Sequence, residues 1–185
     1  IYGAAIAAYF LNIPIAHFHG GETTQGAIDE GIRHSITKMS SFHFAATKKY
    51  KKRIIQLGEK KENVFHVGSL ALDNIKKTKL LKKYDLEKYL NFKFNGNSAL
   101  FTYHPVTLEK YTSRQQIKII LNALDKFKTL NIIFTQSNSD PDNKIINQEI
   151  IKYVKKNKKR TIFVNSMGSL KYYSSLKFVD FVIGN

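Results

Sequence analysis

Two neighbouring segments near the start of the sequence carry residue types that chemistry at a binding site can use. The first is the pair Gly20-Gly21, which is flanked by His19 and Glu22. Two glycines in succession let a strand break sharply and let the backbone approach a ligand closely, because neither residue has a Cβ. The pair therefore predicts a ligand-binding loop, with an ordinary turn as the alternative.

The second segment is a stretch of charged residues at helical spacing. Asp29 and Arg33 are four residues apart, as are Glu30 and His34, so the members of each pair are neighbours on a helix surface. A carboxylate in the first turn of this helix, close to the glycine pair, can act as a general base or acid. The same residues would also stabilise a helix through its dipole and through ion pairs. The spacing alone does not choose between these two interpretations.

Polar residues also follow other predicted strands, and ligands of doubly wound sheets bind outside the carboxyl ends of the strands. His104 precedes Pro105, which restricts it to an extended conformation, and its ring can donate to a phosphate. Asn138 either contacts a ligand or caps the next helix. Other strand ends carry Ser166, Met167 and Gly168, and Gly184 and Asn185. Together these positions predict contacts with a polyanion, although turn chemistry explains any one of them.

The elements that must position these residues are short apolar runs alternating with amphipathic stretches. We expect strands at 13–18, 42–46, 64–67, 99–103, 131–135, 161–164 and 179–183, and helices at 4–11, 29–39, 49–57, 73–89, 114–130, 144–155 and 170–177. The strands are continuous apolar runs, which is typical of parallel sheets covered by helices on both faces. The pattern therefore predicts an α/β fold, with the polar loop at 91–97 as the best candidate for a domain boundary.

Composition narrows the class of protein. Apolar residues make up 43% and charged residues 24%, as in soluble globular proteins. Lys+Arg 30 against Asp+Glu 14 gives a net charge of +16, but the lysines are spread at the spacing of solvent-facing helix surfaces, so we expect no nucleic-acid partner. The apolar opening is too short and too interrupted for a membrane span. The absence of Cys excludes disulfides and thiolate metal sites. Since the chain starts inside a predicted helix and stops after a strand, we expect a piece of a longer protein.

One long block and several shorter ones match a known family. The block comprises His17-Phe18-His19-Gly20-Gly21-Glu22, Gly26-Ala27-Ile28-Asp29-Glu30 and Ile32-Arg33-His34-Ser35-Ile36-Thr37-Lys38-Met39-Ser40. The shorter matches are Glu59-Lys60, Val67-Gly68-Ser69, His104-Pro105-Val106-Thr107, Asn138-Ser139-Asp140 and Ile183-Gly184-Asn185. The sequence resembles, over nearly its whole length, the hydrolysing UDP-N-acetylglucosamine 2-epimerases of bacterial sialic-acid and legionaminic-acid synthesis.

The resemblance implies two Rossmann-like parallel-sheet domains in a GT-B-like arrangement, both incomplete. Residues 1–72 would complete the first domain, 73–97 would join the two, and 98–185 would begin the second, nucleotide-binding domain. The implied reaction converts UDP-N-acetylglucosamine to N-acetylmannosamine and UDP, by elimination to a 2-acetamidoglucal and hydration, with no cofactor and no metal. We further expect a nucleotide-sugar ligand, no membrane partner, a homo-oligomer and a cytoplasmic location.

The resemblance also implies roles for individual residues. Proton transfer would fall to His19, Glu22, Asp29 and Glu30, and His104 would lie near the diphosphate. The division of acid and base roles stays open, because related enzymes carry an acidic residue at the position of His19. Substrate contacts are expected from Gly20, Gly21, Arg33, Asn138, Ser166, Met167, Gly168, Gly184 and Asn185.

Three alternatives remain at this point. The same chemistry would act on a GDP-linked sugar or on a diacetamido-trideoxy sugar of legionaminic-acid synthesis. A GT-B glycosyltransferase would share the fold but pass the sugar to an acceptor. A non-catalytic module for polyanions rests on the net charge alone.

Overall fold

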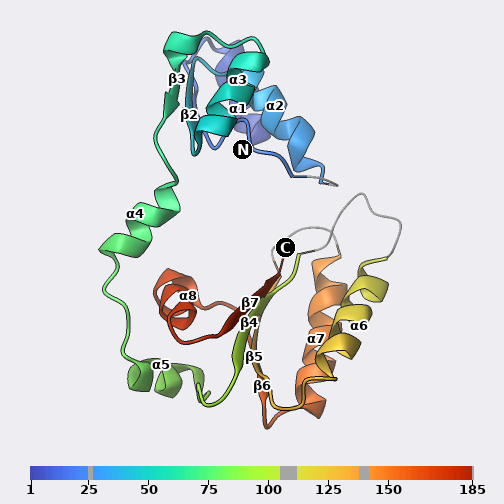
Figure 1. Ribbon diagram of the computed structural model, residues 1–185. Coiled ribbons are helices and arrows are strands. Elements are labelled where there is room, and N and C mark those ends of the chain that lie inside the picture. Colours follow the sequence, from blue (N-terminus) through green and yellow to red (C-terminus); the bar gives the residue numbers. More distant parts are fainter. Residues whose placement is uncertain (25–26, 105–111, 138–141, 185) are drawn as a thin grey trace. The chain divides into compact units, whose positions relative to one another are not determined.

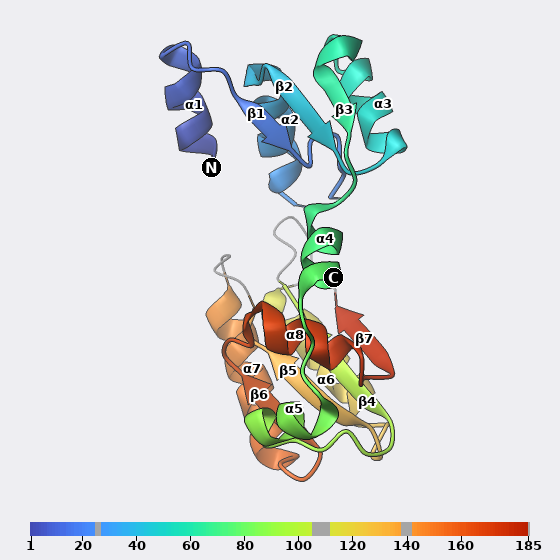
Figure 2. The same cartoon turned by 90° about the vertical axis from the view of Figure 1, so that its left-hand side faces the viewer.

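The computed structural model describes residues 1–24, 27–104, 112–137 and 142–184 (Figure 1). Within these ranges the chain forms two compact units, Ile1–Lys77 and Thr78–Asn185. Each unit has its own sheet, and all strand pairs in both sheets are parallel (Figure 2). The predicted α/β fold with parallel sheets is therefore confirmed.

The first unit is built on a three-stranded sheet in the order β1-β2-β3. Its elements are α1 (Tyr2–Phe10), β1 (Ala16–Phe18), α2 (Asp29–Met39), β2 (Phe42–Ala45), α3 (Lys48–Gln56), the 3-10 helix η1 (Lys61–Asn63), β3 (Val64–His66) and α4 (Leu70–Lys77). Thr47 is the N-cap of α3, and its hydroxyl accepts a hydrogen bond from the backbone N–H of Tyr50. This cap starts α3 immediately after β2, so the helix N-terminus lies beside the carboxyl end of that strand.

The two faces of this sheet differ in what they carry. His17 and His43 are paired in register on adjacent strands, and they lie on the face that α2 and α3 cover. On the other face Phe18, Phe44 and Phe65 stack, with ring centroids 4.6 and 5.4 Å apart. Parallel sheets normally bury both faces, so this aromatic face has the character of an interior surface.

The second unit is built on a four-stranded sheet in the order β6-β5-β4-β7. Its elements are α5 (Lys83–Leu90), β4 (Ser98–Thr102), α6 (Ser113–Leu124), β5 (Asn131–Thr135), α7 (Asn143–Lys156), β6 (Thr161–Val164), α8 (Gly168–Leu176) and β7 (Phe181–Gly184). α6 and α7 cover one face of the sheet, and α5 and α8 cover the other (Figure 1).

Burial on both faces explains why these strands are continuous apolar runs. In β4, Phe101 packs into the core under α6 and α7 together with Ile117 and Ile150. Its neighbour Leu100 points the opposite way and packs with Leu86 of α5. Successive residues of the strand are therefore both fully buried, which an alternating sequence would not allow.

Two predicted helices differ from those observed. The predicted helix 73–89 is two helices, α4 and α5, because the backbone N–H of Leu81 donates to Ser174 Oγ at 2.9 Å. A continuous helix would need that N–H for its own hydrogen-bond ladder. The predicted helix 114–130 ends at Leu124, since Leu130 turns into the core ahead of β5.

The two units divide in the gap between α4 and α5. The division falls after Lys77, inside the segment 73–97 that the resemblance placed between the domains, and not at the polar loop 91–97 that the sequence pattern favoured. Leu86, Phe92 and Phe94 are buried in the core of the second unit.

Within the described ranges, no helix combines the length and the apolar character needed to cross a bilayer.

Candidate active site

The turn that follows β1 carries the most compact group of predicted site residues. The backbone N–H of His19 donates to Phe44 O at 3.0 Å, which fixes the start of the turn to β2. His19 has a φ of 61° and Gly21 a φ of 74°, so the chain reverses through two left-handed residues. As a result His19 Nδ1 and Glu22 Oε1 lie 2.7 Å apart, and their side chains are 41% and 30% exposed. The turn thus presents an imidazole–carboxylate pair to solvent at the carboxyl end of the strand.

Packing leaves little room for a side chain at Gly20 and none at Gly21. A Cβ at Gly20 would lie 3.0 Å from His17 Nδ1, and a Cβ at Gly21 would collide with the carbonyl oxygen of Tyr50 in α3. Both glycines are buried. The backbone at both glycines approaches the sheet and α3 closely, and their predicted contact with a ligand stays a prediction.

The first turn of α2 holds the far end of the same loop. Glu30 Oε2 accepts from the backbone N–H of Thr24 at 2.7 Å and from Arg33 Nη1 at 3.3 Å, and Glu30 Oε1 lies 3.2 Å from His34 Nε2. The hydrogen bond from Thr24 is the largest cause of a lowered Glu30 pKa, and His34 and Arg33 lower it further. Glu30 is therefore held as an anion that fastens the loop to the helix.

The side chains of Arg33 and Asp29 differ in their hydrogen bonding. Arg33 donates from Nη1 to Glu22 O at 3.2 Å and from Nη2 to Thr24 Oγ1 at 3.0 Å, besides its pairing with Glu30. It pairs with Glu30, three residues before it, and not with Asp29, four residues before it. Asp29 is exposed, and no hydrogen bond or ion pair joins its side chain to another residue in the described part of the chain. Arg33 therefore supports the loop, and Asp29 is available to a ligand.

Two further histidines, His17 of β1 and His43 of β2, lie in the sheet that leads into the turn. His17 Nδ1 is 3.2 Å from Thr37 Oγ1, whose hydroxyl donates to Arg33 O, so the His17 ring carries the proton on Nδ1. His43 is only 1% exposed, and its Nε2 lies 3.2 Å from Glu59 Oε2. Burial is the largest cause of a lowered pKa at both histidines, and together with the nearby His43, Arg33 and His19 it lowers the pKa of His17 to about 4. The His17 ring is therefore neutral at pH 7.

This shift predicts acid sensitivity of the fold. His17 binds a proton in the unfolded chain near pH 6.5 but only near pH 4 when folded. The unfolded state binds more protons between these values, so stability falls as pH falls through this window and levels off below it. The full effect is about 3 kcal/mol. Urea unfolding of the full-length protein at several pH values should show this decline.

The variant His17→Asn should flatten the decline between pH 6.5 and 4, because an amide does not titrate there. His66→Asn is the matched control, since His66 is an exposed histidine at the end of β3. An unchanged pH dependence in His17→Asn would show that other groups cause the acid sensitivity.

The second unit has a hollow at the carboxyl ends of its strands. Its volume is about 370 Å³, and it is lined in part by Thr102, Thr135, Gln136, Asn165, Ser166 and Tyr172. The Thr102 and Thr135 hydroxyls, at the ends of the adjacent strands β4 and β5, lie 2.7 Å apart. Gly168 has a φ of 62° and opens α8, so backbone N–H groups of that helix's first turn border the hollow. Hydroxyls, amides and helix N–H groups at this position are suited to an anionic ligand.

Comparison with known proteins identifies the family. Residues 1–185 match the family described as UDP-N-acetylglucosamine 2-epimerase. The chain belongs to this family. It is 43% identical over 98% of its length to a GDP/UDP-N,N'-diacetylbacillosamine 2-epimerase (hydrolyzing) of Campylobacter jejuni, of which it covers 47%. It is 42% identical over its full length to the polysialic acid biosynthesis protein P7 of Escherichia coli, of which it also covers 47%.

Solved structures of the family share the fold. The UDP-GlcNAc 2-epimerase from Neisseria meningitidis, bound to UDP-GlcNAc, aligns with a TM-score of 0.75 at 18% sequence identity. The alignment covers 99% of this chain and 51% of that one. The chain thus spans about half the length of the epimerases that it matches.

The structure brings together some of the predicted site residues and not others. His19, Glu22, Glu30 and Arg33 form one connected network with the two glycines between them. His104 is half-buried just beyond β4 in the second unit. Asn138 and Asn185 lie outside the described residues.

The remaining predicted contacts lie in the second unit. Ser166 and Gly168 line its hollow, but the side chain of Met167 is 7% exposed and packs in the core with Leu100. Only its backbone is therefore placed for a ligand. A Cβ at Gly184 would collide with the Thr102 carbonyl oxygen, so this glycine is required by the pairing of β7 with β4.

Several residues of the site lie outside the sequence prediction. Arg53 and Tyr50 of α3 hold the Gly21 segment, and Thr102 and Thr135 line the hollow. The threonines had a sequence signal, since each ends or nearly ends an apolar run that precedes a polar loop. Arg53 had none, because it lies in a run of consecutive basic residues on α3.

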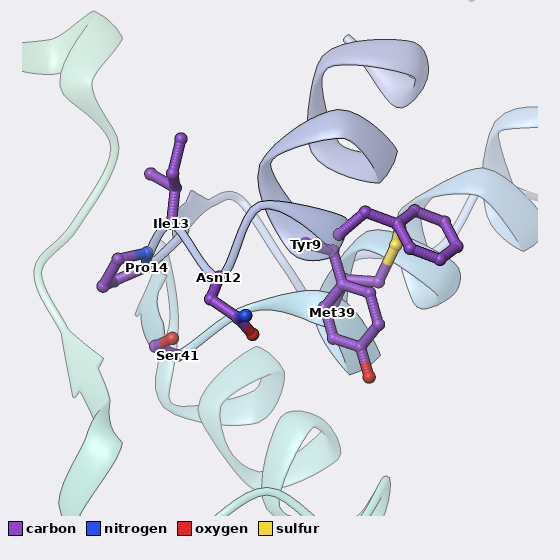
Figure 3. A pocket seen from close by; sticks show the side chains of 7 residues that line it. Tyr9, Asn12, Ile13, Pro14, Met39 and Ser41 are labelled. Carbon is purple, nitrogen blue, oxygen red and sulfur yellow. The ribbon is translucent and has the colours of Figure 1, made fainter.

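The first unit has a hollow of its own, away from the His19 turn. It has a volume of about 450 Å³ and is lined by Tyr9, Asn12, Pro14, Met39 and Ser41 among others (Figure 3). These residues come from the ends of α1 and α2 and precede β1 and β2, at the edge opposite the His19 turn. No group of three or more His, Asp or Glu residues that could hold a metal ion occurs in the part of the chain that the structure describes.

Proposed function

We propose that this chain supplies acid–base and nucleotide-binding residues to a hydrolysing 2-epimerase that converts UDP-N-acetylglucosamine to N-acetylmannosamine and UDP. The observation that carries the proposal is the His19–Glu22 pair, 2.7 Å apart and half-exposed on a braced turn. Such a pair is suited to proton transfer, because the carboxylate orients the imidazole and stabilises its protonated form.

The proposed reaction has two steps. In the first, a base removes the proton from C2 of the sugar, the bond from C1 to the phosphate oxygen breaks, and UDP leaves with the electron pair. The product is a glycal with a double bond between C1 and C2. In the second, water adds its hydroxyl to C1 and a proton is delivered to C2 from the opposite face, which gives N-acetylmannosamine. The oxidation state of the sugar does not change overall, so the reaction requires no redox cofactor.

Roles within the first unit follow from how each carboxylate is bonded. We assign one proton transfer to the His19–Glu22 pair and the other to Asp29, which is exposed and lacks a partner in the described ranges. Glu30 accepts bonds from Thr24, Arg33 and His34, and its lowered pKa makes it a weak base. Its role in the proposal is to hold the loop.

The nucleotide would bind to the second unit. The hollow at the ends of β4, β5 and β6 offers the Thr102 and Thr135 hydroxyls, and Ser166 and Tyr172 line it as well. His104, just beyond β4, would stabilise negative charge on the departing diphosphate. Gly184 lies at the end of the neighbouring strand β7.

A second candidate substrate is a diacetamido-trideoxy sugar linked to UDP or GDP. It is favoured by the relative that is 43% identical and named for diacetylbacillosamine. The chemistry at C2 is the same, so the acid–base residues do not discriminate between the sugars. Discrimination would come from contacts to the sugar at C4 and C6 and to the base.

Incubation of the full-length protein with UDP- and GDP-linked N-acetylhexosamines and diacetamido sugars tests the proposal. NMR of the mixture should identify a free sugar inverted at C2 together with free nucleotide, in the absence of any acceptor. Release of nucleotide only when an acceptor is added would establish a glycosyltransferase instead. A homo-oligomer in the cytoplasm is part of the same proposal, and light scattering of the purified protein tests the oligomer.

A further inference from the structure

The turn that carries the His19–Glu22 pair is held by arginines from two different helices. Arg33 of α2 donates to the carbonyl oxygen of Glu22 at 3.2 Å. Arg53 of α3 donates from Nη1 to the carbonyl oxygen of Gly21 at 2.8 Å. Two consecutive peptide groups of the turn are therefore each fixed by a separate guanidinium.

The bond from Arg53 acts on the peptide group that sets the position of Glu22. The carbonyl of Gly21 and the backbone N–H of Glu22 belong to one rigid plane. Gly21 tolerates many backbone conformations, so this plane can rotate unless something holds it. Fixing the Gly21 carbonyl therefore fixes the direction in which the Glu22 side chain leaves the backbone.

The side chain of Arg53 donates to the Gly21 carbonyl and makes no ion pair in the part of the chain that the structure describes. Its guanidinium lies 5.9 Å from the centre of the Tyr50 ring on the same face of α3, and no carboxylate pairs with it in the described part of the chain. The carbonyl oxygen of Tyr50 also blocks any side chain at Gly21. One turn of α3 thus contacts the glycine through its backbone and binds the glycine's carbonyl through Arg53.

We propose that Arg53 is a positioning residue for the His19–Glu22 pair, which rests on the function proposed above. Arg53 touches neither of these side chains and acts through the Gly21–Glu22 peptide group. Loss of its hydrogen bond lets Glu22 move away from His19, and small displacements of catalytic groups cost large factors in rate.

The test compares Arg53→Met, Arg53→Lys and Lys52→Met in the full-length protein. Met removes the donor and keeps an apolar stem, Lys restores one donor, and Lys52→Met removes a charge from an exposed position of the same helix. We expect Arg53→Met to lower kcat about a hundredfold with KM within about threefold. Arg53→Lys should recover most of kcat, and Lys52→Met should match the wild type. Arg53→Met within threefold of wild type, or equal losses in Lys52→Met, would overturn the proposal.

A crystal structure of Arg53→Met supplies a readout that does not depend on activity. The proposal requires the His19–Glu22 distance to lengthen beyond hydrogen-bond range from 2.7 Å. An unchanged turn contradicts it. If the wild-type protein releases no nucleotide from any nucleotide-sugar, the proposed function fails, while this structural comparison still decides whether Arg53 holds the turn.

Discussion

The variant Glu22→Gln of the full-length protein should lose about a thousandfold in kcat and keep its affinity for the nucleotide. Glutamine has the shape of glutamate and can still contact His19 Nδ1, so the turn should keep its conformation. It has no negative charge to orient the imidazole and to stabilise its protonated form, and general acid–base catalysis contributes factors of about 10²–10⁴. Steady-state kinetics and calorimetric titration with the nucleotide measure the two quantities separately.

A double-mutant cycle with His19→Asn shows whether the two residues act as one unit. Asparagine tolerates the left-handed conformation that His19 adopts at a φ of 61°, so the turn itself is preserved. If the pair acts together, the double variant should be no slower than the slower single variant. Independent, multiplying losses would mean that each residue has a separate role.

A methyl group at Gly21 should both destabilise the protein and reduce its activity. In Gly21→Ala the new Cβ meets the Tyr50 carbonyl oxygen, and the φ of 74° is unfavourable for alanine. Backbone strain of about 1–2 kcal/mol and overpacking of about 1–3 kcal/mol add to one another. We expect a Tm about 10 °C lower, together with a large loss of kcat because the His19–Glu22 turn is displaced.

Gly31→Ala is the matched control, with the opposite sign. Gly31 lies on the exposed side of α2, and a Cβ there meets nothing within 4 Å. Alanine favours the helix over glycine by about 0.5–1 kcal/mol, so Tm should rise slightly and kcat should not change. Equal thermal stabilities of Gly21→Ala and Gly31→Ala would contradict the packing that fixes the turn.

The sequence predicts the strands of both sheets because burial dictates their composition. Continuous apolar runs such as 99–103 and 131–135 match β4 and β5, which are buried on both faces. Helix ends are predicted less well, because they depend on single contacts distant in sequence. The bond from Leu81 to Ser174, which interrupts the predicted helix 73–89, joins residues that no local pattern connects.

The same distinction applies to the site. The Glu30–His34 contact joins residues four apart on a helix, so their spacing predicts it directly. The His19–Glu22 contact depends on the left-handed turn between the two residues, and the sequence showed only that both flank the glycine pair. The Arg53–Gly21 bond spans a strand and a helix, and a cation in the basic run of α3 gives no sign of it. Glu30 was predicted to transfer protons, and its bonds to Thr24, Arg33 and His34 became visible only in three dimensions.

The most direct test of the central claim is the reaction of the full-length protein in D₂O, followed by NMR of the free sugar. Proton removal at C2 by the groups of the His19 turn predicts a product inverted at C2 that carries deuterium there, with the nucleotide released in equal amount. A free sugar that keeps its original hydrogen and configuration at C2 would contradict the claim, because the bond to the nucleotide would then break by simple hydrolysis.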